Sequence, residues 1–233
     1  MQDPAANFER PLFILGLPRS GTSLVAGLCK KSGFWVGTTV VADRNNPKGY
    51  FEHVEIREAL IKQLLIELGC DPLGVRKLPE PDALQVSFNV KRKLAQVLKR
   101  DGYRADRPWL YKDAKMCLLW PLFHQAFPNA NWLIVSRDTE SFVDSCLRTN
   151  FMRQHSDSRE FWYSLAEQYL QRLASLREVS SRVFELHSPD LFAGDYSKLE
   201  RVLQAYGLIK NEAKLGKFIN ADHWHGKKTD ASR

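Results

Sequence analysis

The sequence predicts an α/β protein with three layers, in which helices cover both faces of a central, mostly parallel sheet. Short apolar runs that suit buried strands occur at residues 11–15, 109–113 and 132–137, and each is followed by polar or cationic residues. Apolar residues recur every three or four positions between and after these runs, which is typical of amphipathic helices. Strands that alternate with helices favour a parallel sheet covered on both sides.

The remaining elements follow in order along the chain. A helix is expected from residue 24 to 31, ended by Gly33, and a second from 54 to 68, closed by Gly69. Loops are expected between these helices and over the proline-rich stretch that follows the second one. Further helices are expected over 84–98, 118–127, 140–148, 161–176 and 196–206, and a further strand over 183–186.

The length of 233 residues favours one domain over residues 1–233, with a flexible tail from about residue 220. Lysine and arginine number 34 against 27 aspartate and glutamate residues, so the formal charge is +7. This modest excess suits an anionic small-molecule ligand. No strongly basic stretch has interleaved aromatics, so a nucleic-acid partner is not expected.

The composition also bears on the compartment. The four cysteines have no metal-like spacing, and three fall in apolar helical patterns that suggest buried free thiols. The sequence shows no signal peptide and no apolar run near the roughly 20 residues of a membrane span. We therefore expect a cytoplasmic protein; the alternative is an enzyme whose membrane anchor lies outside this sequence. The oligomeric state is not indicated.

The turn between the first strand and the first helix carries the clearest chemical signal. Backbone N–H groups and the positive end of the helix dipole converge there, so such a turn binds anions. Gly21 allows the backbone to come close to an oxyanion. The side chains of Ser20, Thr22 and Ser23 add hydroxyl donors, and Arg19 adds a planar cation.

A nucleoside-triphosphate site of the Walker A type is the obvious comparison. Gly16 and Gly21 have the spacing of that loop, but Thr22 stands where its lysine is expected. The cation lies three positions earlier, at Arg19. The turn therefore favours another anion, and a P-loop kinase of a small metabolite or nucleotide is an alternative.

Residues 18–23, Pro-Arg-Ser-Gly-Thr-Ser, resemble the 5′-phosphosulfate loop of sulfotransferases that use 3′-phosphoadenosine 5′-phosphosulfate (PAPS). The arginine version of the loop is similar to that of the tyrosylprotein sulfotransferases and of many bacterial-type members. The resemblance implies a P-loop-NTPase-like sulfotransferase fold, PAPS as co-substrate, adenosine 3′,5′-bisphosphate as product, and no metal. It also implies that Arg19 is catalytic and that residues 19–23 bind the donor.

A second part of the resemblance lies at the end of the strand at 132–137. Arg137 ends this strand, and Ser145 follows eight residues later on the next helix. In sulfotransferases, an arginine and a serine in this arrangement hold the 3′-phosphate of PAPS. Arginine suits the task because its planar fork meets two phosphate oxygens at once. We expect Arg19 and Arg137 to hold opposite ends of one nucleotide; the alternative is an ordinary ion pair at Arg137.

Two further residues are candidates for catalysis. Lys112 and Asp113 resemble a Lys-Asp-Pro or Lys-Thr-Pro segment whose lysine reaches the sulfonate, and an ordinary ion pair is the alternative. Residues 46–52, Asn-Pro-Lys-Gly-Tyr-Phe-Glu, resemble a segment of bacterial-type sulfotransferases. An acceptor hydroxyl must lose its proton, so Glu52 is the candidate base, with His53 and Asp113 as alternatives. Glu52 alternatively only favours the start of the next helix through its dipole.

The acceptor is not fixed by the sequence. A carbohydrate, a phenol and a peptide tyrosine are all compatible with the candidate residues. Aromatic side chains that could line its site, or equally the core, are Trp35, Tyr50, Phe51 and Trp109. A third function also remains open, namely a non-catalytic module with the sulfotransferase fold that binds an anion or a nucleotide.

Overall fold

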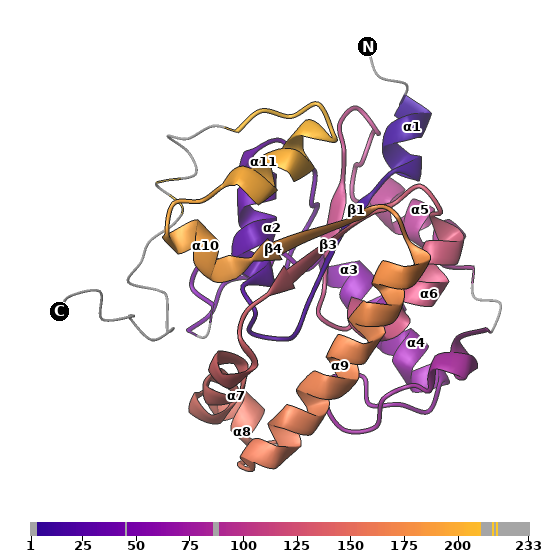
Figure 1. The fold of residues 1–233 in the computed structure, drawn as a ribbon. Coiled ribbons are helices and arrows are strands. Elements are labelled where there is room, and N and C mark those ends of the chain that lie inside the picture. The colour runs from indigo at the N-terminus through magenta and orange to yellow at the C-terminus, as the bar shows by residue number, and fades with distance from the viewer. Residues whose placement is uncertain (1–3, 45, 86–88, 211–215, 217, 219–233) are drawn as a thin grey trace.

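A computed structural model describes residues 4–44, 46–85, 89–210, 216 and 218. The sheet at its centre has the strand order β2-β1-β3-β4, and every neighbouring pair is parallel (Figure 1). The tail predicted to be flexible lies outside the described residues. The strands are β1 (Leu12–Leu15), β2 (Leu110–Lys112), β3 (Asn131–Ser136) and β4 (Val183–His187).

One face of the sheet carries the larger of two apolar clusters. Phe13 and Leu15 of β1 point to this face, because successive side chains of a strand alternate. Trp132 lies beside them, with 4.9 Å between its ring centroid and that of Phe13. The helices on this face are α3 (Val54–Ile56), the π-helix η1 (Arg57–Ile61), α4 (Lys62–Glu67), α5 (Val90–Arg100), α6 (Met116–Ala126), α7 (Thr139–Arg148) and α9 (Arg159–Val179).

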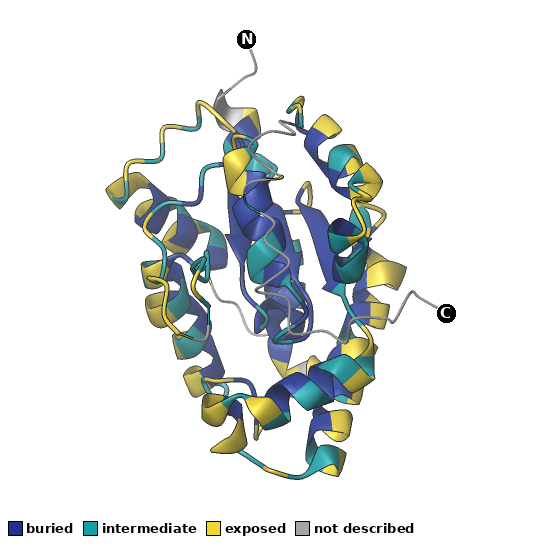
Figure 2. Cartoon of the chain, turned by 90° about the vertical axis from the view of Figure 1, so that its left-hand side faces the viewer, coloured by how far each residue is buried: buried dark blue, intermediate teal, exposed yellow. Residues whose placement is uncertain are grey.

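The opposite face carries a second cluster. Leu12 and Ile14 point to it, together with Leu133 and Val135 of β3. In Figure 2 the sheet is mostly buried and lies between helices on two sides. These two clusters confirm the predicted three-layer α/β architecture. The helices on the second face are α2 (Thr22–Lys31), α10 (Ser188–Phe192) and α11 (Ser197–Gln204).

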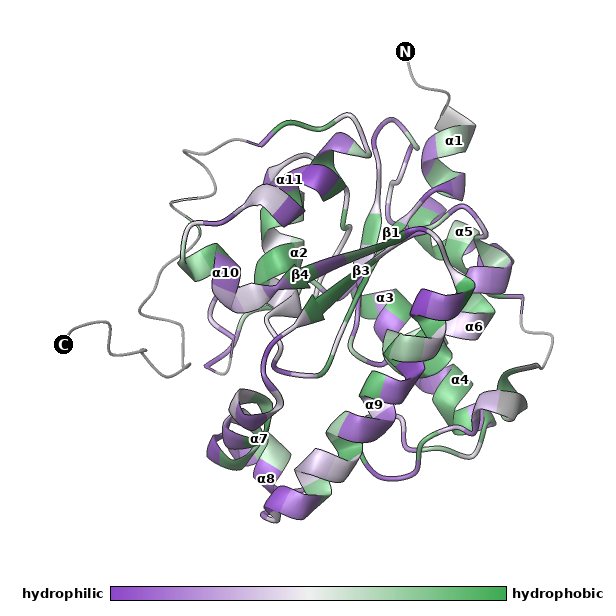
Figure 3. Cartoon of the chain, viewed as in Figure 1, coloured by the Kyte–Doolittle hydropathy of each residue, from purple (hydrophilic) through white to green (hydrophobic). Residues whose placement is uncertain are grey.

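The spacing of apolar residues along the long helix α9 determines which side of the helix packs against the sheet. Its buried residues recur at helical spacing, with Leu165, Tyr169, Leu173 and Leu176 inside. Figure 3 shows hydrophilic and hydrophobic residues alternating along this helix. No helix in the part of the chain described here is long and apolar enough to cross a bilayer.

Three short helices are absent from the sequence prediction: α1 (Pro4–Glu9), α8 (Asn150–Arg153) and α10. Elements this short carry too few apolar positions to show a period. The helix expected over 84–98 begins instead at Val90, where Asn89 caps it by accepting a hydrogen bond from the backbone N–H of Arg92. A short 3-10 helix, η2 (Pro81–Gln85), precedes it.

The parallel sheet brings the ends of all four strands to one edge. β1 leads into the loop before α2, β3 leads to α7 and α8, and β4 leads directly into α10 (Figure 1). In sheets of this kind, ligands bind beyond the carboxyl ends of the strands.

Candidate active site

The carboxyl edge of the sheet borders a cleft of about 780 Å³. A cleft of this size lies within the range of small-molecule sites, roughly 300–1,000 Å³. Of the residues that the sequence predicts for the site, Ser20 does not line this cleft. Those that do are Arg19, Gly21, Thr22, Ser23, Glu52, Lys112, Arg137 and Ser145.

The loop before α2 is shaped by Gly21, whose φ of +93° is strained for any residue with a Cβ. A Cβ at this position would lie 2.8 Å from the Cβ of Ser188, the first residue of α10. Gly21 is the N-cap residue of α2, and no side chain in the described part of the protein caps this end of the helix. The first N–H groups of a helix have no partner within it, so those at the start of α2 are available to an anion.

Ser20 was predicted to bind the donor, and its backbone N–H is engaged within the loop. Its backbone N–H donates to the carbonyl of Leu17 at 3.2 Å, so the amide donors expected over residues 20–23 are reduced to residues 21–23. The hydroxyls of Ser20 and Ser188 are fully buried and have no hydrogen-bond partner among the residues that the structure describes, and Ser188 lies against Gly21. Unsatisfied buried polar atoms are uncommon, and a bound water or ion is one explanation for them. The loop therefore fits an anionic ligand.

The two predicted arginines lie side by side. Nε of Arg19 donates to Oγ of Ser145 at 3.2 Å, and NH1 of Arg137 donates to the carbonyl of Arg19 at 2.9 Å. The second contact supports a loop residue with an unfavourable φ of +65°. Burial, together with the nearby guanidinium groups of Arg19 and Arg148, lowers the pKa of Arg137 against the opposing effect of Asp138. The predicted anion sites therefore adjoin in one cationic region.

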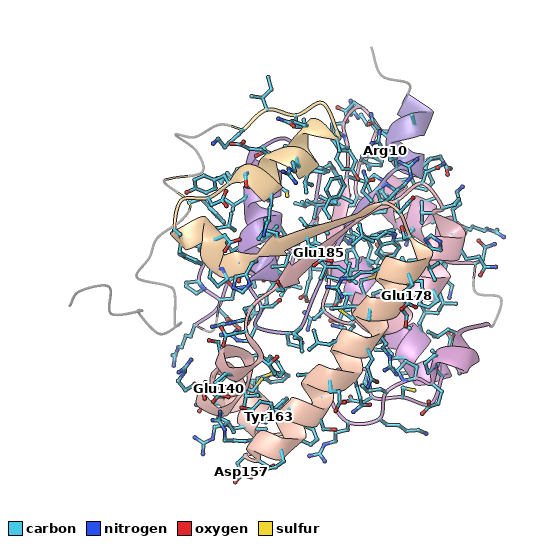
Figure 4. The ribbon with its side chains drawn as sticks, in the orientation of Figure 1. Arg10, Glu140, Asp157, Tyr163, Glu178 and Glu185 are labelled. Carbon is cyan, nitrogen blue, oxygen red and sulfur yellow. The ribbon has the colours of Figure 1, made fainter. Side chains whose placement is uncertain are left out.

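Contacts with α9 hold the helix that carries Ser145. The carboxylate of Asp138 caps the N-terminus of α7. Glu140 of α7 and Tyr163 of α9 lie together in Figure 4 and form a hydrogen bond. Arg159 of α9 binds Glu140, and its NH1 donates to Asp144 at 2.8 Å. Helix α7 is thereby held against α9 at the edge of the cleft.

Two residues predicted to be catalytic, Glu52 and Lys112, form an ion pair with each other, the type of contact that the sequence analysis gave as the alternative for Lys112. Nζ of Lys112 donates to Oε1 of Glu52 at 2.7 Å, and the side chains are 5% and 12% exposed. Arg57 approaches the other carboxylate oxygen of Glu52, with 3.4 Å between Nε and Oε2. Both oxygens of Glu52 therefore face cations at the wall of the cleft. The contact joins the end of β2 to the segment before α3.

His53, the first alternative base, does not line the cleft. Its Nδ1 accepts from the backbone N–H of Ile56 at 3.4 Å and so caps α3. Its Nε2 lies 3.1 Å from the carboxylate of Asp101, which also accepts from the backbone and hydroxyl of Thr38. Both ring nitrogens are therefore used in holding the chain around Glu52.

Asp113, the second alternative base, is fully buried. One carboxylate oxygen accepts from the Tyr111 hydroxyl at 3.0 Å, and the other accepts from the backbone and Nζ of Lys115. Burial raises the pKa of Asp113, but Lys115 and Lys112 outweigh this effect and bring it below its ordinary value. Asp113 borders the cleft but is fully buried, whereas the Glu52 side chain is partly exposed, so Glu52 is the more accessible of the two carboxylates.

Three of the four aromatics considered for the acceptor site belong elsewhere. Trp109 is fully buried in the core, and Trp35 packs on Tyr103, with 5.0 Å between ring centroids. Phe51 packs against the cluster that contains α2. Only Tyr50 of these four lines the cleft.

The cleft contains cations that sequence reasoning missed, among them Arg44, Lys48, Arg57 and Lys115. Arg57 and Lys115 each follow a predicted residue within five positions, and this proximity was the available signal. Nothing in the spacing shows that Arg57, the first residue of the π-helical turn η1, lies against Glu52.

A sequence model of the sulfotransferase family matches residues 11–212. This chain belongs to the sulfotransferase family. The matched region begins just before β1 and ends after α11, so it includes every residue of the candidate site. A search of curated proteins found no matching sequence.

Solved sulfotransferases share the fold of this family member. The sulfotransferase domain from the curacin biosynthetic pathway is 13% identical with a TM-score of 0.60, and the match covers 94% of this chain and 81% of that one. The sulfotransferase domain of the Synechococcus PCC 7002 olefin synthase is 16% identical with a TM-score of 0.57, over 92% and 78%. Sulfotransferase STF1 of Mycobacterium tuberculosis is 14% identical with a TM-score of 0.50, over 90% and 70%. At these identities the likeness concerns the fold.

Proposed function

We propose that this sulfotransferase uses PAPS as its donor and transfers the sulfonate to a hydroxyl acceptor. The observation that carries the proposal is the gathering in one cleft of the α2 N-terminus, the Arg19–Arg137–Ser145 cluster and the Glu52–Lys112 pair. A doubly phosphorylated nucleoside needs two adjoining anion sites, because both phosphates are attached to one ribose. Arg137 and Ser145 would hold the 3′-phosphate, and residues 21–23 would hold the 5′-phosphosulfate.

Three side chains of the cleft, those of Arg19, Glu52 and Lys112, have chemical roles in the proposed reaction. The bound donor supplies an activated sulfonate and a phosphate leaving group. The acceptor oxygen bonds to sulfur, the bond from sulfur to the phosphate oxygen breaks, and Glu52 takes the hydroxyl proton. Arg19 and Lys112 stabilise the charge on the sulfonate and the departing phosphate oxygen. Arginine does not give up a proton near neutral pH, so Arg19 acts through its charge.

Ligand-dependent thermal stability tests the donor. Adenosine 3′,5′-bisphosphate should raise the melting temperature of the full chain much more than ATP with Mg²⁺, because the cleft offers two adjoining anion sites and lacks the Walker lysine. The reverse order would favour the kinase alternative. Binding of the bisphosphate without transfer from PAPS to any member of a broad hydroxyl panel would favour the non-catalytic module.

The cytoplasm is our proposed location. The four cysteines are free thiols, which suits a reducing compartment.

A further inference from the structure

We infer that the acceptor is a hydroxyl compound with an apolar body, a phenol or another apolar alcohol, and not a sugar; this inference rests on the proposed function. It comes from two groups of apolar side chains in the lining of the cleft, one on each face of the sheet. Leu24 and Phe192 belong to α2 and α10 on the face that carries the anion loop. The other apolar group, called here the acceptor wall, consists of Leu73, Val75, Phe151, Met152 and Tyr169.

The acceptor wall adjoins the proposed catalytic pair. Lys115 follows Lys112 by three residues at the end of β2, and its aliphatic stem packs on the turn that carries Leu73. A Cβ on Gly74 in that turn would lie 3.2 Å from Cγ of Lys115 and 2.7 Å from the Tyr169 hydroxyl. An acceptor that covers the wall therefore lies against Lys115, three residues from Lys112 along the chain, and Lys112 lines the same cleft.

A hydrogen-bonded turn carries Leu73 and Val75 of the acceptor wall. The carboxylate of Asp71 accepts from the backbone N–H groups of Leu73, Val75 and Arg76 at 2.9–3.0 Å. Burial raises the pKa of Asp71, but these three hydrogen bonds outweigh that effect and lower it. The turn is thus fixed before any acceptor binds, which reduces the ordering cost of binding.

Two contacts tie this turn to the rest of the wall. The Tyr169 hydroxyl donates to the carbonyl of Gly74 at 2.8 Å, and Arg76 donates to the carbonyl of His155 at 2.8 Å, just beyond α8. Helix α8 carries Phe151 and Met152. The apolar side chains therefore form one preformed surface drawn from three separate segments.

Polar groups along the wall already have protein partners. The Tyr169 hydroxyl is bound to Gly74, the Thr149 hydroxyl donates to the carbonyl of Ser145 at 2.7 Å, and Nζ of Lys115 is bound to Asp113. A sugar laid on this wall would lose the hydrogen bonds that its hydroxyls make with water and gain few from the wall itself, which is costly. An apolar body would instead cover Leu73 and Phe151, which are 36% and 48% exposed.

The experiment compares 2-naphthol and 1-decanol with glucose and N-acetylglucosamine as acceptors for the full chain with PAPS. Sulfate ester formation is measured by mass spectrometry, and 2-naphthol binding in the presence of adenosine 3′,5′-bisphosphate is measured by calorimetry. We expect the apolar alcohols to be sulfated and 2-naphthol to bind. The Leu73→Ser and Phe151→Ser variants should each raise the KM for 2-naphthol about 10-fold, because each loses apolar contact area.

The control is Ile66→Ser on α4, because Ile66 is also half exposed but does not line the cleft. It should leave KM unchanged, and all three variants should bind adenosine 3′,5′-bisphosphate as the parent does, which also shows that they fold. Absence of 2-naphthol binding, or sulfation of the sugars alone, overturns the inference while the proposed function stands. Failure of the bisphosphate itself to bind would instead overturn the proposed function.

Discussion

Glu52 faces two cations, Lys112 and Arg57, and this sets the expectation for its removal. The Glu52→Gln variant keeps a hydrogen-bonding oxygen for Lys112 but cannot take a proton, so kcat should fall about 100-fold or more. Affinity for adenosine 3′,5′-bisphosphate, measured by calorimetry, should change little. Glu58→Gln is the matched control, since Glu58 also lies beside Arg57 but does not line the cleft. Full activity of the Glu52 variant would assign the base elsewhere.

Arg137 has two tasks, because it supports the carbonyl of Arg19 and faces the cleft. The Arg137→Ala variant should weaken binding of adenosine 3′,5′-bisphosphate by about 1.5–3 kcal/mol, the usual contribution of a hydrogen bond to a charged group. Calorimetric titration measures this change. Arg92→Ala, at an exposed position on α5, should leave the affinity unaltered. Equal affinities in both variants would remove Arg137 from the nucleotide site.

His53 predicts a pH dependence of stability. Burial lowers its pKa below the ordinary 6.5, against the attraction of Asp101. As the pH falls below 6.5, the unfolded chain binds a proton that the folded chain does not, so the free energy of unfolding falls. The pKa of Asp101 lies below 3.8, so this carboxylate keeps its charge in that window.

The test compares the parent with His53→Asn, which keeps an acceptor for the α3 cap but does not titrate. Urea unfolding at about pH 7.5 and about pH 5.5 should show a larger loss of stability in the parent. Identical losses in the two proteins would show that His53 does not titrate in this window.

At the scale of elements, the junction between the first loop and α2 depends on Gly21. The Gly21→Ala variant must accommodate an unfavourable φ of +93° and a clash with Ser188, so we expect a loss of about 1–3 kcal/mol of stability. Nucleotide affinity should also fall, because the N–H groups at the start of α2 shift. Denaturant unfolding and calorimetry measure the two effects.

A second substitution separates the two causes. Ser188→Gly in the same chain removes the clash but not the backbone strain, so it should restore only part of the lost stability. Full recovery would mean that the φ of Gly21 costs nothing.

The accuracy of the predictions made from the sequence also differs between elements. The strand at 132–137 was predicted within one residue, because a buried run bounded by polar residues leaves little choice. The adjacency of Arg19 and Ser145, 126 residues apart, could not be read from spacing, since it depends on how β1 and β3 pair. The cap on α3 was missed because the capping atom belongs to His53, and imidazole is not among the residues preferred at that position.

At the scale of the molecule, the single domain remains a prediction. The two apolar clusters share one sheet, so loss of one exposes the other, and calorimetry should show one unfolding transition. Adenosine 3′,5′-bisphosphate at about 100 times its Kd should stabilise that transition by about 2.7 kcal/mol. Two separate transitions, with only one responding to the nucleotide, would show that the chain holds more than one folding unit.

The sheet also separates the proposed nucleotide-binding segment from the proposed acceptor-binding segments. The anion loop begins α2 on one face, while the turn fixed by Asp71 and the short helix α8 lie toward the other. If the proposed donor and acceptor are correct, exchange of residues 71–76 and 150–153 for those of a relative should alter which acceptor is modified and leave nucleotide affinity unchanged. These two segments could therefore be exchanged together, while the sheet and the other helices are kept unchanged.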